Sequence, residues 1–165
     1  MKTEEQLLQQ LAALCASKEC CLQELRKRLA KSDLPEEAQS RILQQLQAER
    51  FVDEARFARC FTADKFRFNR WGRIRINYEL TQKGIPSDIR QEALAGIDEE
   101  QYRETLTDLL LAKKKTTQAK HTGELFQKLL RFAASRGYES AITYDCLHTI
   151  INSSENEDFE IPDMD

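Results

Sequence analysis

The chain has 165 residues, a formal net charge of −3 and a hydrophobic fraction of 41%, so it can form one compact domain or several small modules. No apolar run is long enough for a membrane-spanning helix, and the N-terminus lacks the apolar core of a signal peptide. Five cysteines, an odd number without framework spacing, argue against a disulfide-stapled secreted fold. We therefore expect a cytoplasmic protein.

Residues 1–51 have the pattern of a three-helix module. A first helix is predicted by leucines at helical spacing, namely Leu7, Leu8, Leu11 and Leu14. Two short helices joined by a tight turn are then predicted. Two apolar residues four apart indicate the first helix, a step of five residues crosses the turn, and further apolar residues at helical spacing indicate the second helix. These positions are Leu25, Leu29, Leu34, Ala38, Ile42, Leu43 and Leu46. Asp33 stands where a left-handed residue ends the second helix.

The same apolar spacing returns in residues 52–97. Asp53 is placed to cap a first helix, whose core face is predicted to carry Phe57, Phe61 and Phe68. The helix pair follows at Ile76, Leu80, Ile85, Ile89, Ala93, Leu94 and Ile97. Gly84 falls at the end of the second helix, where a left-handed residue is needed, and this favours glycine.

Residues 98–152 carry a third copy of the pattern. Its first helix is predicted by Tyr102, Leu106, Leu109 and Leu110. The helix pair is predicted by Leu129, Ala133, Tyr138, Ile142, Cys146, Leu147 and Ile150, with Gly137 at the position of Gly84. A period of about fifty residues indicates an array of similar units. The predicted fold class is all-α, with three tandem three-helix repeats in an extended, curved array.

The charge is distributed unevenly along the chain. Ten basic and five acidic residues lie between Arg50 and Arg90, a net charge of +5, so the remainder of the chain carries −8. Residues 153–165 contain six acidic residues and no basic one, and we expect them to be a disordered tail. Such a tail is either a solubilising end or an autoinhibitory segment that competes for the basic module.

A helical wheel places basic residues of the middle module on one face. Arg56, Arg59, Arg67 and Arg70 fall within an arc of roughly 80°, and Phe66 lies beside them. The basic surface continues into the next helix through Arg73 and Arg75. Two interpretations are open: a solvated basic helix whose Phe66 packs on the neighbouring module, or a face that docks on an anionic partner.

These residues carry a family resemblance. Asp53-Glu54-Ala55-Arg56-Phe57-Ala58-Arg59, then Gly72-Arg73-Ile74-Arg75, Glu79-Leu80 and Lys83-Gly84-Ile85, resemble the RecX family of recombinase regulators in order and spacing. The first module is similar through Glu24-Leu25 and Leu29, and the third mainly through the internal repeat. Cys21 stands where the family commonly has a serine, so we expect a weaker cap on that helix.

The resemblance implies a monomer that binds in the groove of the RecA filament on DNA. From the sequence itself we expect no cofactor and no membrane association. The resemblance also implies inhibition of filament extension, ATP hydrolysis and strand exchange, and modulation of DNA repair and the SOS response. The predicted partner-binding residues are Arg56, Arg59, Phe66, Arg67, Arg70, Arg73, Arg75 and Lys83. The predicted structural residues of the motif are Asp53, Phe57, Gly72, Leu80, Gly84 and Ile85.

Two other functions are considered. A module that binds nucleic acid directly fits three helices with a tight turn, although the sequence pI of about 5.6 is unlike that of a strong DNA binder. An enzyme is disfavoured because the sequence contains no nucleophile–base set, metal-ligand cluster or phosphate loop. His121 and His148 are interpreted as surface or packing residues. We therefore predict no catalytic residues and no metal site.

Overall fold

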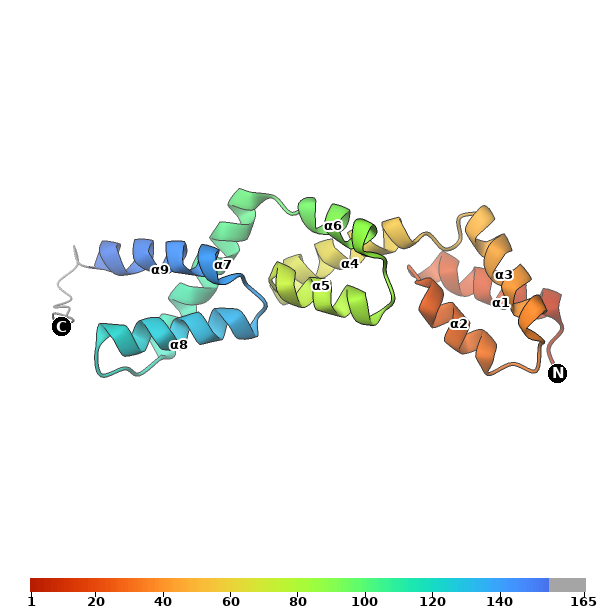
Figure 1. Ribbon diagram of the computed structural model, residues 1–165, viewed down its shortest axis with the longest axis horizontal. Coiled ribbons are helices and arrows are strands. Elements are labelled where there is room, and N and C mark those ends of the chain that lie inside the picture. Colours follow the sequence, from red (N-terminus) through yellow and green to blue (C-terminus); the bar gives the residue numbers. More distant parts are fainter. Residues whose placement is uncertain (155–165) are drawn as a thin grey trace. The chain divides into compact units, whose positions relative to one another are not determined.

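The computed structural model describes residues 1–154, which form nine α-helices and no strand (Figure 1). The predicted all-α class and three-helix repeats are confirmed. Contacts divide the chain into two compact units that alternate along the sequence. The first unit contains Met1–Asp64 and Asn77–Gly96, and the second contains Lys65–Ile76 and the chain from Ile97 onward. No described helix is long and apolar enough to cross a membrane.

The first repeat consists of α1 (Glu4–Ser17), α2 (Leu22–Ala30) and α3 (Glu36–Ala48). Thr3 and Gln6 form a capping box that satisfies backbone donors at the start of α1. The predicted apolar faces meet in a core that includes Leu7, Leu11, Leu25, Leu29, Ile42 and Leu46. Cys21 is the residue before α2, and it makes no side-chain hydrogen bond to the start of the helix, which agrees with the expected weaker cap.

The turn after α2 differs from the prediction for Asp33. The non-glycine residues with positive φ in the described part of the chain are Arg50, at 59°, and Arg70, at 55°, so the left-handed assignment of Asp33 is wrong. The hydroxyl of Ser32 instead donates to the carbonyl of Leu29 at 2.5 Å and satisfies the end of α2. A side-chain hydrogen bond from Ser32 therefore ends α2, and Asp33 does not have to adopt a strained left-handed backbone conformation.

The second repeat consists of α4 (Glu54–Asn69), α5 (Arg73–Gln82) and α6 (Ser87–Ala95). The carboxylate of Asp53 accepts from the backbone N–H of Arg56 at 3.0 Å, which is the predicted cap of α4. Phe57, Leu80 and Ile85 are buried, as predicted. Gly84 has φ of 75°, which agrees with its assignment as the left-handed residue after α5.

The predicted core position of Phe68 is wrong. Phe68 is 71% exposed, whereas Phe57 is buried and its ring stacks on Phe61 at 5.9 Å between centroids. The reason is that α4 changes partners along its length, because its residues from Lys65 onward belong to the second unit. There the packed side of the helix is the one that carries Phe66, whose ring lies 5.8 Å from that of Tyr102.

The third repeat consists of α7 (Glu99–Thr116), α8 (Thr122–Ser135) and α9 (Ser140–Ser154), with α8 and α9 side by side in Figure 1. Its fully buried side chains include Tyr102, Leu106, Leu110, Leu129 and Tyr138. Gly137 has φ of 93°, as predicted from its equivalence to Gly84. Helix α9 extends to Ser154, and residues 155–165 of the predicted acidic tail lie outside the described residues.

Candidate functional site

The end of α4 and the start of α5 form a sharp corner in the second unit, residues 65–76. Helix α4 ends at Asn69, and the left-handed conformation of the next residue, Arg70, lets the N–H of Trp71 donate to the carbonyl of Lys65 at 3.2 Å. Helix α5 starts three residues after Arg70, at Arg73. The corner sequence contains no acidic residue, so its cations are balanced only by groups from other segments.

Backbone hydrogen bonds hold this corner against the turn between α8 and α9. The N–H of Gly72 donates to the carbonyl of Arg136 at 2.8 Å, and the N–H of Ile74 donates to that of Gly137 at 2.9 Å. The hydroxyl of Tyr138 donates to the carbonyl of Arg70 at 2.9 Å. A Cβ on Gly72 would lie 2.3 Å from the carbonyl carbon of Gly137, so Gly72 permits this close approach.

Arg73 lies at the centre of a polar network inside the second unit. Its guanidinium bonds Glu99 at 2.5 Å and Glu139 at 3.0 Å, and lies 3.8 Å from the ring centroid of Tyr102. The hydroxyl of Tyr102 donates to Glu139 and accepts from the N–H of Arg73. Burial is the main cause that raises the pKa of the Tyr102 hydroxyl, and the hydrogen bond to Glu139 raises it further. Arg73 is therefore engaged in folding contacts, although it was predicted to contact a partner.

Other cations of the corner lie at the surface beside aromatic rings. Arg75 and Lys65 are placed over the Trp71 ring, at 4.1 Å and 5.0 Å from its centroid. Arg67 lies 5.3 Å from the ring centroid of the exposed Phe68. Arg70 is exposed, and Ile74 is 55% exposed. We call this set the basic–aromatic corner: Lys65, Arg67, Phe68, Arg70, Trp71, Ile74 and Arg75.

The remaining predicted partner-binding residues lie in the first unit. The guanidinium of Arg56 bonds Glu19 at 2.7 Å and the carbonyl of Arg50 at 3.2 Å, so it ties α4 to the first repeat. Arg59 is exposed. Lys83 lies 5.7 Å from the ring centroid of Phe61 and lines a cleft of the first repeat.

The structure thus brings together only part of the predicted set. Arg67, Arg70 and Arg75 share the corner, whereas Arg56 and Arg73 make internal contacts. Phe66 packs against Tyr102, which agrees with the alternative interpretation of that residue.

Sequence reasoning missed Phe68 and Ile74 as exposed apolar groups. The position of Phe68 between Arg67 and the polar Asn69 was the available signal. Within residues 1–154, no three His, Cys, Asp or Glu side chains form a group that could hold a metal ion.

Comparison with known proteins gives consistent matches. The family model described as the second three-helix domain of RecX matches residues 53–94. Regulatory protein RecX of Clostridium perfringens (strain 13) is 30% identical over 138 residues, which cover 82% of this chain and 62% of the relative. Its counterpart in Clostridium botulinum (strain Alaska E43) is 31% identical over 140 residues, with the same coverage. The chain therefore spans 62% of the length of these relatives.

Two solved structures show the fold. RecX from Lactobacillus salivarius aligns with a TM-score of 0.77 and 18% identity, covering 93% of this chain and 97% of that chain. Another crystal structure of a regulatory protein RecX aligns with a TM-score of 0.76 and 19% identity, covering 88% of this chain and 73% of that chain. At such identities the likeness concerns the arrangement of helices, while the family is indicated by the sequence matches.

Proposed function

The chain belongs to the RecX family, and on this premise we propose that it is a regulatory protein that binds the RecA–DNA filament as a monomer. Binding inhibits filament extension, ATP hydrolysis and strand exchange, and so modulates DNA repair and the SOS response. The proposal is supported by relatives that are named regulatory proteins. It needs no cofactor and no catalytic residue of this chain, because the protein acts by occupying a surface of its partner.

The observation that carries the proposal is the basic–aromatic corner. Arg67, Arg70 and Arg75 offer guanidinium groups that can bind phosphates or carboxylates in a bidentate manner. Phe68 and Ile74 add exposed apolar area beside them. Arginine and large aromatic side chains together are typical of the residues that contribute most to binding at protein interfaces. A face exposed only to water has no need for this combination.

The corner is also rigidly supported, which favours binding. Its backbone is fixed to the α8–α9 turn by the hydrogen bonds of Gly72 and Ile74, and its loop is further held by Tyr138. The ring of Trp71 lies near the cations of Lys65 and Arg75. Side chains held in this way lose less conformational entropy on binding than free ones.

The test measures RecA ATP hydrolysis and strand exchange on single-stranded DNA with increasing amounts of this protein. The parent is expected to inhibit both. The variant Arg67→Glu with Arg70→Glu is expected to lose most of the inhibition, because it places negative charge where an anionic surface docks. The control Lys115→Glu with Arg131→Glu makes the same change in net charge at exposed positions of α7 and α8.

Circular dichroism and thermal melting must show that all variants are folded. If the corner variant inhibits as strongly as the parent, the corner is not the docking surface. If the parent itself leaves both activities unchanged across the concentration range, the proposed function is wrong.

A further inference from the structure

The most acidic part of the chain follows α9 directly. Residues 155–165, which lie outside the described residues, contain six acidic residues and no basic one, a net charge of −6. Three large apolar residues, Phe159, Ile161 and Met164, are interspersed with these acids. We call residues 155–165 the acidic segment. It combines negative charge with apolar groups, as the basic–aromatic corner combines positive charge with apolar groups.

The corner has cations that no described carboxylate neutralises. Among residues 1–154, Arg67, Arg70 and Arg75 form no ion pair. Phe68 and Ile74 lie with them at the surface, 71% and 55% exposed. A segment that carries both acids and apolar side chains can contact both kinds of group at once, which gives complementary charge and buries apolar area.

The acidic segment is attached where it can reach the corner. The hydroxyl of Tyr138, just before α9, donates to the carbonyl of Arg70 in the corner. Helix α9 has 15 residues, which corresponds to a length of about 22 Å from this end to Ser154. The 11 residues of the acidic segment span up to about 36 Å when extended. The segment can therefore run back along α9 and bring its distal acids to the corner, within the second unit.

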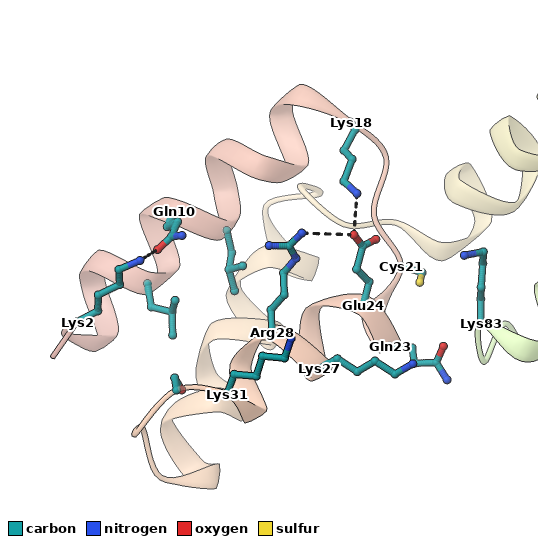
Figure 2. A pocket seen from close by; sticks show the side chains of 13 residues that line it. Lys2, Gln10, Lys18, Cys21, Gln23, Glu24, Lys27, Arg28, Lys31 and Lys83 are labelled. Atoms are coloured by element: carbon teal, nitrogen blue, oxygen red, sulfur yellow. Dashed lines mark hydrogen bonds and ion pairs between the residues drawn. The ribbon is translucent and has the colours of Figure 1, made fainter.

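The other basic surface of the molecule matches the acidic segment less well. It is the cleft of the first unit, bordered by α1, α2 and the turn between α5 and α6 (Figure 2). Glu24 lies in its lining and bonds Lys18 at 2.7 Å, as a dashed line in Figure 2 shows. Its two leucines, Leu7 and Leu11, are buried, so its lining has no exposed large apolar side chain. The cleft thus offers charge without the apolar contacts that the corner provides.

We propose that residues 155–165 dock on the basic–aromatic corner of the same molecule and cover it. A segment tethered beside its site has an effective concentration on the order of millimolar, so even a weak contact is occupied. Salt screens exposed charges and therefore releases the segment. An anionic partner has to displace the segment before it can bind the corner. The docking itself requires no RecA, and only its consequence for filament inhibition rests on the proposed function.

The single tryptophan of the chain reports on the corner directly. Trp71 belongs to the corner and is half-buried, so quenching of its fluorescence by acrylamide measures how far the corner is covered. The full chain is measured at low and at high salt, without RecA. The quenching constant of the parent is expected to rise at least about twofold with salt, because release of a segment that covers half or more of the molecules doubles the uncovered fraction.

Charge reversal in the acidic segment tests the contact. The variant Glu160→Arg with Asp163→Arg is expected to lose most of this salt dependence, because it is already released at low salt. The control Glu104→Arg with Asp108→Arg makes the same change in net charge at exposed positions of α7 and is expected to behave like the parent. The proposal is overturned if the segment variant keeps the salt dependence of the parent, or if the control loses as much.

A reciprocal exchange of charge identifies the docking surface. Arg67→Glu with Arg70→Glu is expected to lose the salt dependence, and combining it with the reversed segment is expected to restore part of it, since the charges are again complementary. The cleft variant Lys27→Glu with Lys31→Glu is expected to keep it. No recovery in the combined protein, or a loss in the cleft variant, overturns docking on the corner. Protection of Trp71 that appears only as protein concentration rises overturns docking within one molecule.

Inhibition of RecA ATP hydrolysis measures the consequence separately. The variant Glu160→Arg with Asp163→Arg is expected to inhibit at a several-fold lower concentration than the parent, because no segment has to be displaced. A parent that does not inhibit at all would overturn the proposed function, while the quenching of Trp71 would still decide whether the segment docks.

Discussion

Arginines that look equivalent on a helical wheel have different roles in the structure. Arg56 and Arg73 are held by carboxylates, Glu19 for the first and Glu99 with Glu139 for the second. Arg67 and Arg70 are exposed. The wheel gives the direction of a side chain but not the position of a distant carboxylate, so it cannot separate the two kinds of arginine. The carboxylate partners lie 26 to 66 residues away in sequence.

The two phenylalanines near the end of α4 provide a test of packing against binding. Phe66→Ala is expected to destabilise the protein by about 1–3 kcal/mol, because the ring of Phe66 packs against Tyr102. This loss is smaller than for truncation of a fully buried phenylalanine, since the ring is only half-buried. Phe68→Ala is expected to change stability by less than about 0.5 kcal/mol, since its ring is exposed, but to weaken filament binding. Thermal melting and filament binding of both variants check this. A stable Phe66→Ala protein would contradict the packing role.

Two glycines of the motif are needed for different reasons. Gly72→Ala is expected to destabilise by more than about 2 kcal/mol, because its Cβ would lie 2.3 Å from the backbone of Gly137 and prevent the corner from packing. Gly84→Ala is expected to cost about 1 kcal/mol, because φ is 75° while the space around the Cβ is open to 3.8 Å. Chemical denaturation measures the free energy of unfolding of both variants. Equal losses of stability would show that the close approach of Gly72 to Gly137 does not require a glycine.

At the scale of helices, repetition made the fold predictable. Apolar residues recur with the same spacing three times, and the buried residues of each helix pair, such as Leu80 and Ile85, are at the predicted positions. The division into two units was not predictable, because its boundaries lie inside α4 and α5. Within the second unit, Gly72 and Ile74 bond the turn at Arg136 and Gly137, and no local pattern reveals such distant pairing.

The end of α4 uses an arginine where α5 and α8 are followed by glycine. Arg70 has φ of 55°, which is unfavourable for a residue with a Cβ. Arg70→Gly is therefore expected to stabilise the protein by up to about 1 kcal/mol, while the carbonyl that accepts from Tyr138 is retained. Filament inhibition is expected to fall, because the charge is lost.

Arg70→Ala is the matched control for this variant. It removes the same charge but keeps a Cβ in the left-handed conformation, so it is expected to lose inhibition without gaining stability. Denaturant titration of the three proteins measures stability, and the ATP hydrolysis assay measures inhibition. A gain in stability for Arg70→Ala as large as for Arg70→Gly would show that backbone strain is not the cause.

For the whole molecule, net charge hides the local charges that matter. The excess of basic residues between Arg50 and Arg90 is visible in the sequence and led to the basic–aromatic corner, although Phe68 and Ile74 were not expected there. The cleft of the first unit was missed, since Lys2 and Lys83 join the cations near α2, Lys18, Lys27, Arg28 and Lys31, only through folding. Contiguous charge is readable from a sequence, whereas charge assembled by folding is not.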